Sequence, residues 1–347
     1  MARHRKTRGG ARGPGRPRRL GRRIALVVCA VLVVLGGAGG FAYYKLDGNL
    51  HGVDIDKALG KDRPKKVDNG AENILVLGSD SRSGANGAYG RDEGSARSDT
   101  AMVLHLAKGR KSGTLISIPR DTLVDRPSCT APNGSTTAAA SGVMFNSAYS
   151  AGGPACSVKT VEKLTGVRMD HFVEIDFAGF TKVVDALGGV TVDIPQDIDD
   201  NDSHLHITKG VHKLDGKQAL GLVRTRHGVG DGSDLGRIKL QQLFIRSLMK
   251  QVESSSLLTS PTKLYRTADA ATKTVTTDSG LDSLSSLTSF ARSMSGLTGS
   301  RLKTVTMPVQ YDPSNPNRVI PINSEMTRLW TAVQHDRPVP AVKGTAE

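Results

Sequence analysis

Apolar and polar positions change their spacing along residues 71–340 in a way that separates strands from helices. Apolar runs and strict alternation are typical of strands, whereas apolar residues three or four positions apart predict helices. The expected strands are 73–77, 100–106, 114–118, 171–177, 190–194 and 302–309. The expected helices are 158–164, 177–187, 215–223, 235–252 and 324–333. Because strands alternate with helices, the sequence predicts a single α/β domain with a mixed sheet in an αβα arrangement.

Three segments lack such a pattern. Residues 45–70 are polar, with Gly, Asp, Lys and Pro, and we expect them to form a stalk before the domain. Residues 126–142 are rich in Ser, Thr and Ala and predict a flexible loop. Residues 253–300 carry many Ser and Thr and are only weakly helical in pattern.

Residues 24–44 form an uncharged stretch of 21 residues. An apolar helix of about 20 residues is long enough to span a bilayer, so we expect a transmembrane helix here. A cleaved signal peptide is the alternative. The run is long for a signal peptide, and residues 41–44 offer no small-residue cleavage site.

The formal charge of +14 is concentrated at the N-terminus, because residues 1–23 hold ten of the 47 Lys and Arg and no acid. The remainder is nearly balanced, with 37 basic against 33 acidic residues. By the positive-inside bias, the tail is cytoplasmic and the domain extracellular, on a single-pass protein of the cell membrane. The tail mixes Arg with Gly and Pro and lacks aromatics, so it reads as disordered. Topology accounts for its charge without nucleic-acid binding.

Three cysteines fit this topology. Cys29 lies in the expected membrane helix, while Cys129 and Cys156 lie in the extracellular part. A disulfide is favoured outside the cell, so we expect Cys129 and Cys156 to form a structural bridge, with two unpaired thiols as the alternative. No Cys-x-x-Cys pattern indicates redox chemistry.

Charged side chains lie next to the expected strands. Asp80 and Arg120 each follow an apolar run, and Arg97 and Asp99 precede one. Ligands of α/β sheets bind beyond the carboxyl ends of strands, so Asp80 and Arg120 could share one rim. An antiparallel neighbour that starts at this rim would add Arg97 and Asp99.

A second charged group follows further along the chain. Arg224 and Arg226 are separated by a single residue. Asp234, Arg237 and Gln241 share one face of the expected helix. Arginine binds phosphate with a planar fork of donors, and carboxylates bind divalent cations. The two groups together predict a pocket for a pyrophosphate and a divalent cation.

Seven motifs occur in order along this region. They are Asn-Ile-Leu-Val-Leu-Gly-Ser-Asp-Ser-Arg (73–82), Arg-Ser-Asp-Thr (97–100), Ser-Ile-Pro-Arg-Asp (117–121), Phe-Asn-Ser-Ala-Tyr (145–149), Leu-Gly-Gly-Val-Thr-Val-Asp (187–193), Val-Arg-Thr-Arg-His (223–227) and Asp-Leu-Gly-Arg-Ile-Lys-Leu-Gln-Gln (234–242). On these motifs the chain closely resembles the LytR-CpsA-Psr family of bacterial cell-wall ligases, from about residue 73 to 252.

The resemblance implies a reaction. Family members move a glycopolymer phosphate from an undecaprenyl-pyrophosphate carrier to a peptidoglycan hydroxyl, usually the C6 hydroxyl of N-acetylmuramic acid. A magnesium ion bridges the pyrophosphate. Phosphoryl transfer mostly requires positioning and charge neutralisation, which suits a site without a protein nucleophile.

The resemblance also implies residue roles. Asp80 and Asp99 hold Mg²⁺ or its waters. The implied pyrophosphate ligands are Arg97, Arg120, Arg224, Arg226 and Arg237, with Gln241 beside them and Asp234 orienting the arginines. Asp99, Arg120 and Arg226 are the residues expected to carry catalysis. Asp80 or Asp99 could also accept the proton of the attacking hydroxyl, or the metal could lower that hydroxyl's pKa.

Two other functions stay open at this point. One is a polyprenyl-pyrophosphate hydrolase that uses the same pocket with water as the acceptor. The other is a non-catalytic protein that binds wall polymers or has a regulatory role. The polymer is not identified by the sequence: a teichoic acid, a capsule or another wall glycan would all fit.

Some details depart from the family pattern or concern the substrate's lipid. Many relatives carry Lys where this chain has Met144, and Lys159 could supply the missing charge. An apolar slot for the polyprenyl tail could involve Phe172, Phe177, Phe180, Phe244 and Leu248, although each reads more simply as a core residue. We interpret His204 and His206, with Asp199, Asp200 and Asp202, as a solvated loop rather than a metal site.

Overall fold

A computed structural model describes residues 37, 39–79, 98–131, 133–226, 234–254 and 260–341. The chain divides into two compact units, residues 1–45 and residues 46–347. The described residues of the first unit are helical. Within the described ranges, no helix combines the length and apolar character needed to cross a membrane. Most of the expected transmembrane segment, residues 24–36 and 38, lies outside those ranges, so the membrane helix stays a prediction.

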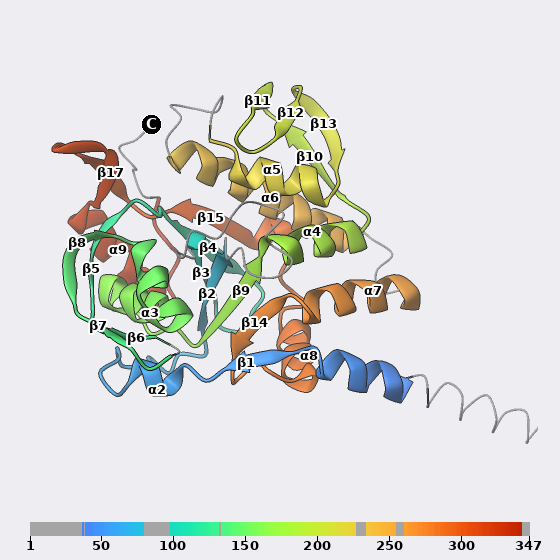
Figure 1. Ribbon diagram of the computed structural model, residues 1–347, viewed down its shortest axis with the longest axis horizontal. Coiled ribbons are helices and arrows are strands. Elements are labelled where there is room, and N and C mark those ends of the chain that lie inside the picture. The colour runs from blue at the N-terminus through green and yellow to red at the C-terminus, as the bar shows by residue number, and fades with distance from the viewer. Residues whose placement is uncertain are drawn as a thin grey trace, which may run out of the picture. The chain divides into compact units, whose positions relative to one another are not determined.

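A seven-stranded mixed sheet organises the second unit (Figure 1). In spatial order its strands are β1 (His51–Val53), β14 (Val275–Asp278), β9 (His171–Asp176), β2 (Glu72–Ser79), β3 (Ser98–Leu106), β4 (Gly113–Ile118) and β15 (Leu302–Thr306). β9 runs parallel to β2 and β15 runs parallel to β4, while β3 is antiparallel to both β2 and β4. The carboxyl ends of β2, β4, β9 and β15 therefore meet the start of β3 at one rim.

Helices cover both faces of this sheet, as the alternation along β2 requires. On one face Leu75 and Leu77 pack in a core with α3 (Ser147–Thr165) and α9 (Asn323–Gln334). On the other face Val76 packs with Met102 and with α6 (Asp234–Ser254). Figure 1 shows α3 and α9 on one side of the sheet and α6 on the other. The predicted mixed α/β arrangement is confirmed.

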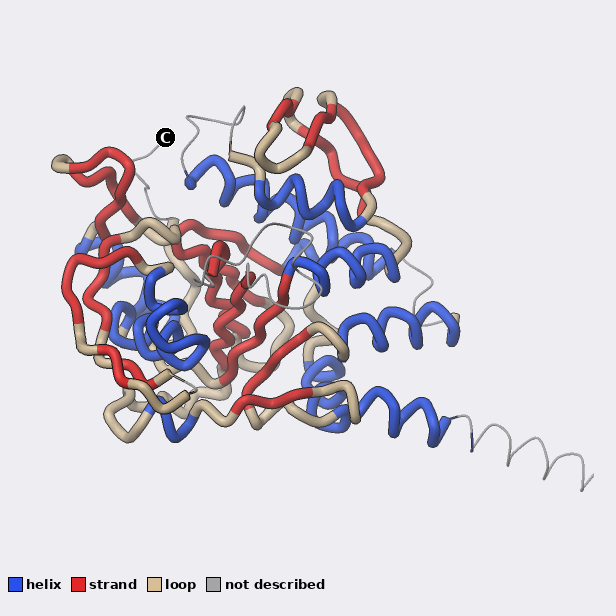
Figure 2. Tube along the Cα trace, in the orientation of Figure 1, coloured by secondary structure: helices blue, strands red, loops and turns tan. Residues whose placement is uncertain are grey.

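A separate apolar cluster forms beside α6. It joins α4 (Phe177–Ala186) and α5 (Gly216–Arg224) with the antiparallel pair β10 (Val190–Ile194) and β13 (Gly210–Leu214). A shorter hairpin, β11 (Ile198–Asp200) and β12 (Leu205–Ile207), lies next to this pair (Figure 2). Asp176 caps α4 by accepting from the Gly179 N–H at 2.6 Å, and Asp215 caps α5 by accepting from the Gln218 N–H at 2.8 Å. Side-chain oxygens at these positions satisfy amides that the first helical turn leaves unpaired.

Residues 46–70 belong to the compact unit, which begins earlier than the expected stalk would suggest. They supply the edge strand β1 and the short helix α2 (Asp56–Leu59), whose Leu59 enters the core. Arg63 then donates to both carboxylate oxygens of Glu162 on α3, at 3.0 and 2.6 Å, and to the Met169 carbonyl at 2.8 Å. Both partners are buried, with 8% and 2% of their side chains exposed.

The expected loop at 126–142 contains short antiparallel strands. β5 (Leu123–Arg126) pairs with β8 (Ala140–Met144), and β6 (Cys129–Thr130) pairs with β7 (Thr136–Thr137). The sequence missed them because each is only two to five residues long, and runs that short carry little periodicity.

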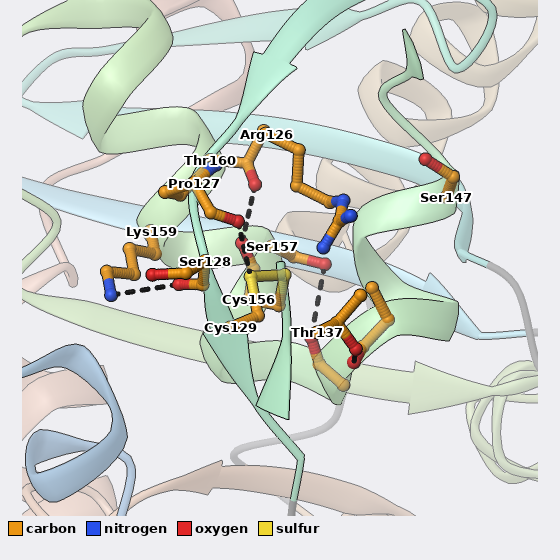
Figure 3. Close-up of a disulfide and its surroundings, with 12 residues drawn as sticks. Arg126, Pro127, Ser128, Cys129, Thr137, Ser147, Cys156, Ser157, Lys159 and Thr160 are labelled. Atoms are coloured by element: carbon orange, nitrogen blue, oxygen red, sulfur yellow. Dashed lines mark hydrogen bonds between the residues drawn. A yellow bond between two sulfur atoms is a disulfide. The ribbon is translucent and has the colours of Figure 1, made fainter. Parts of the chain in front are cut away.

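A disulfide joins this segment to α3. It links Cys129 and Cys156, whose Cα atoms are 5.4 Å apart (Figure 3). α3 is kinked at Gly152 and Gly153, and Gly153 adopts φ 65°, a conformation that favours glycine. A Cβ at Gly152 would lie 2.9 Å from the Cys156 Cβ and 3.0 Å from the Cys129 Cβ. The absence of a side chain at Gly152 therefore lets α3 lie against Cys129 without a clash.

The end of the chain is more finely divided than the sequence predicted. Residues 253–300 include α7 (Pro261–Thr272), the sheet strand β14 and α8 (Leu284–Ser293). The expected strand 302–309 is β15 followed by the start of a hairpin, β16 (Val309–Asp312) and β17 (Asn315–Pro321). The last helix is found as α9, one residue longer at each end than predicted.

Candidate functional site

Two predicted site residues meet at the carboxyl rim of the sheet. Arg120 follows the end of β4, and Asp99 is the second residue of β3. The Arg120 guanidinium forms an ion pair with the Asp99 carboxylate. The antiparallel register of β3 with β4 brings them together, because Ala101 lies opposite Ile118, two residues from each.

The first turn of α6 adds Asp234 and Arg237 to this rim. Asp234 accepts from the Arg120 N–H at 3.0 Å and forms an ion pair with Arg237 three residues further on. Arg237, with 4% of its surface exposed, donates to the Asp99 carbonyl at 2.9 Å. Asp234 thus contacts two of the predicted arginine ligands, which agrees with an orienting role.

Gln241 lies one helical turn further along α6 and is also buried. Its amide nitrogen donates to the Thr100 hydroxyl and to the Val223 carbonyl, both at 3.0 Å. Both amide hydrogens are therefore used within the protein. Gln241 braces β3 against the end of α5, and its amide oxygen is the atom it could offer to a ligand.

The end of α5 positions the remaining arginines. Arg224 is the last helical residue, and its guanidinium lies 4.8 Å above the centre of the Phe177 ring. Thr225 leaves the helical conformation with ψ 132°, so Arg226 belongs to a differently directed segment. The Arg226 Nη2 atom is buried and has no hydrogen-bond partner among the described residues. A buried cationic donor of this kind is costly unless an anion binds it.

All of these predicted side chains except Asp234 line one cavity of about 250 Å³. The predicted residues around it are Asp99, Arg120, Arg224, Arg226, Arg237 and Gln241. Phe177, a candidate for the lipid slot, also lines it, and the residues that the sequence did not assign to it are Thr100, Asp200, Asp202, Ser203 and Val223. The lining combines these four arginines with three aspartates, so cationic side chains outnumber carboxylates by one and the cavity can attract an anion.

Asp200 and Ser203 are the main residues that sequence reasoning missed. We expected their segment to be a solvated loop, which is wrong for Asp200, with 2% of its surface exposed, and for Ser203, with 7%. Asp199 and His206 do form an exposed ion pair. Within β11 Ile198 and Asp200 are buried and Asp199 is exposed, a difference between the two aspartates that the sequence Ile-Asp-Asp does not reveal.

Two predicted ligands, Asp80 and Arg97, lie outside the described residues. Across the part of the chain that the structure describes, no three His, Cys, Asp or Glu side chains gather as a metal site. Magnesium in phosphate sites uses one or two carboxylates together with phosphate oxygens and water. Asp99, on the cavity wall beside the arginines, fits that requirement as one ligand.

A half-buried carboxylate lies near the rim, on the sheet face that α3 covers. Glu174 accepts a 2.5 Å hydrogen bond from the Tyr149 hydroxyl, and burial raises the pKa of Glu174 above its ordinary value. Burial likewise raises the pKa of Asp121, more than the neighbouring Arg120 lowers it. Since neither carboxyl group lines the cavity, neither is assigned to the site.

Lys159 does not replace the missing lysine at Met144. Its ammonium donates to the Ser128 carbonyl at 3.0 Å, beside the disulfide (Figure 3), and it does not line the cavity. Among the apolar candidates, only Phe177 lines the cavity. Phe172 lies in the core under α3. Phe180 and Phe244 pack against each other, with 5.3 Å between the centres of their rings.

Comparisons with known proteins agree with these observations. The model of the LytR_cpsA_psr family matches residues 42–334. The cell wall biosynthesis protein LcpA of Corynebacterium glutamicum is 32% identical, over 83% of this chain and 60% of its own length. The polyisoprenyl-teichoic acid–peptidoglycan teichoic acid transferase TagV of Bacillus subtilis is 30% identical, over 75% of this chain and 64% of its own length. The chain thus spans less than two thirds of these curated relatives.

Solved structures show the same fold. The crystal structure of B. subtilis TagV superposes with a TM-score of 0.60 and 26% identity, covering 78% of this chain and 100% of that one. TagT bound to LI-WTA superposes with a TM-score of 0.58 and 23% identity, covering 82% of this chain and 98% of that one.

Proposed function

Because the chain belongs to the LytR-CpsA-Psr family, we propose that it is a membrane-anchored phosphotransferase of the cell wall. Its donor is a glycopolymer carried on undecaprenyl pyrophosphate, and its acceptor is a peptidoglycan hydroxyl, the C6 hydroxyl of N-acetylmuramic acid. Residues 24–44 anchor it in the cell membrane. The tail at 1–23 is cytoplasmic and the domain is extracellular.

The observation that carries this proposal is the cavity lined by four arginines. Arg120, Arg224, Arg226 and Arg237 line it, and the Arg226 Nη2 atom has no partner among the described residues. The donor's pyrophosphate supplies several anionic oxygens for such a set. The resemblance of the chain to a teichoic acid transferase supports a glycopolymer as the transferred group.

The chemistry that we propose needs no nucleophile from the protein. The acceptor oxygen forms a bond to the phosphorus that carries the glycopolymer, and the bond from that phosphorus to the bridging oxygen breaks. Undecaprenyl monophosphate leaves, and the acceptor hydroxyl gives its proton to a carboxylate of the site, Asp99 or Asp80. The arginines neutralise the charge on the leaving phosphate, which is the main requirement of phosphoryl transfer. Mg²⁺, held through Asp99 and, as the sequence predicts, Asp80, would add charge neutralisation at the pyrophosphate.

We propose the following roles for the residues around the cavity. Arg226 and Arg120 contact the pyrophosphate. Asp234 fixes Arg237 and the backbone of Arg120, through the contacts already described. Gln241 has its amide hydrogens engaged, so it holds the frame of the site.

Transfer from a defined polyprenyl-pyrophosphate glycan to peptidoglycan oligomers, with magnesium, tests the proposal. We expect the full-length protein to form the phosphodiester-linked product, and Arg120→Ala and Arg226→Ala each to lower its rate by about 10²–10³-fold. Arg328→Ala is the matched control, because Arg328 lies on α9, with 58% of its side chain exposed, in a surface pair with Glu325.

The product distribution separates the alternatives. Release of glycopolymer phosphate into water with no acceptor product would favour a hydrolase. Binding of the donor without any turnover would favour a wall-polymer binding protein. Full activity in both cavity variants would contradict the site.

A further inference from the structure

A single buried carboxylate connects the β11–β12 hairpin to the arginine segment. Asp200 ends β11, and its Oδ1 accepts from the backbone N–H of Asp202 at 2.9 Å and of Ser203 at 3.3 Å. Its Oδ2 accepts from the backbone N–H of Arg226 at 3.0 Å. One side chain therefore fixes a turn and, at the same time, the residue whose guanidinium enters the cavity.

A pair of hydroxyls reinforces this connection at Thr225, the residue before Arg226. The Ser203 and Thr225 hydroxyls are 2.9 Å apart, and Thr225 is fully buried. Thr225 also bonds through its hydroxyl to the Gly221 carbonyl at 2.9 Å. A Cβ at Gly221 would lie 3.1 Å from the Ser203 carbonyl oxygen, so α5 rests closely on the hairpin turn.

The chemistry of Asp200 argues against direct contact with the pyrophosphate. A carboxylate repels phosphate oxygens, and both oxygens of Asp200 are already occupied by backbone donors from two segments. The chain leaves the helical conformation at Thr225, so no helical hydrogen bond fixes the direction of Arg226. The Asp200 bond supplies that constraint.

We propose that Asp200 is a positioning residue, which sets the backbone of Arg226 so that its guanidinium points into the cavity ready to bind the substrate's pyrophosphate. This inference rests on the proposed function, since it assumes that Arg226 binds a pyrophosphate. Ser203 assists by holding Thr225. The hairpin is thus part of the binding site's framework.

Asp200→Asn tests this role, because the amide keeps the shape of the side chain but has one acceptor oxygen in place of two. Either the turn or the Arg226 N–H loses its partner. Asp199→Asn is the matched control: it is the preceding residue on the same hairpin, with 84% of its side chain exposed and a surface pair with His206. The probe is geranyl pyrophosphate with Mg²⁺, titrated calorimetrically into the full-length protein in detergent.

We expect Asp200→Asn to weaken binding of the probe by about ten- to a hundredfold, the effect of leaving one buried polar group unsatisfied. Asp199→Asn should bind as the wild type does. In an Arg226→Ala background, Asp200→Asn should have almost no further effect, because the side chain that it positions is gone. A purely structural role would instead give the same loss in both backgrounds.

The outcomes separate this inference from the proposed function. If the wild type does not bind the probe, the proposed function is wrong and the role of Asp200 falls with it. Two outcomes would overturn the positioning role alone, given that the wild type binds the probe. One is an unchanged affinity in Asp200→Asn. The other is a loss of affinity that is the same with and without the Arg226 side chain. Should Asp200→Asn fail to fold, Ser203→Ala replaces it. That variant should weaken binding severalfold, and only when Arg226 is present.

Discussion

The buried pair of Arg63 and Glu162 gives the sharpest prediction about stability. Glu162→Gln removes the charge from a carboxylate that accepts three hydrogen bonds from Arg63 and one from the Met169 N–H. Arg63 then remains buried without a full counter-charge, its nearest other carboxylate being the exposed Asp56 at 3.7 Å. Breaking one partner of a buried pair costs about 3–5 kcal/mol. The retained amide oxygen places this variant at the lower end, about 3 kcal/mol.

The melting temperature of the full-length protein in detergent measures this cost. For a domain of this size each kcal/mol lowers the midpoint by about 2–4 °C, so we expect a decrease of roughly 6–12 °C. Glu325→Gln is the matched control, since its pair with Arg328 is at the surface and contributes at most about 0.5 kcal/mol.

A double variant checks the physical reason. Replacing both Arg63 and Glu162 by Met leaves no unpaired charge, so it should be less damaging than the sum of the two single replacements. Each kcal/mol corresponds to roughly 2–4 °C in the melting temperature. Melting temperatures of Glu162→Gln and Glu325→Gln that lie within about 2 °C of each other would therefore refute the reasoning. Residues 46–70 would then not depend on this contact.

Two further predictions concern pH and oxidation. The hydrogen bond with Asp278 raises the pKa of His171 above 6.5, against the opposing effect of burial. The stabilisation is therefore complete below pH 6.5 and is lost as the pH rises through the raised pKa, so His171→Gln should flatten the dependence of the melting temperature on pH above 6.5. Cys129→Ser should destabilise the protein by about 3.5 kcal/mol, from the 27-residue separation of Cys129 and Cys156. Thiol titration of the denatured wild type should find only Cys29, and three reactive thiols would contradict the bridge.

The sequence predicted the rim of the sheet well because that rim depends on local patterns. The apolar run before Arg120 and the alternation after Asp99 identify two strands, and antiparallel pairing then brings the two charges together. The order of the strands could not be predicted in the same way. β1 and β14 pair although His51 and its partner Thr276 are far apart in the chain, and no pattern within either segment predicts that pairing.

The sequence predicted the cationic residues of the site. It missed Asp200, a carboxylate whose partner is a backbone N–H. Arginines that are close together in the sequence indicate an anion-binding site by their residue type alone. Asp200 resembles any acidic loop residue until the fold brings the Arg226 N–H to it. Gln241 was found by helical spacing, but its bonds to Thr100 and Val223 depend on three elements that only the fold assembles.

The contact between Gly152 and the disulfide has an evolutionary consequence. A side chain at position 152 would lie 3.0 Å from the Cβ atom of Cys129, which the bridge holds against α3, and also close to Cys156 on the same helix. In a chain without the bridge the two segments could separate to admit it. Substitutions at these three positions are therefore epistatic. While the bridge is present, it disfavours any side chain at position 152. Once the glycine has been replaced, loss of Cys129 and Cys156 would be favoured, because their bridge is what requires a glycine there.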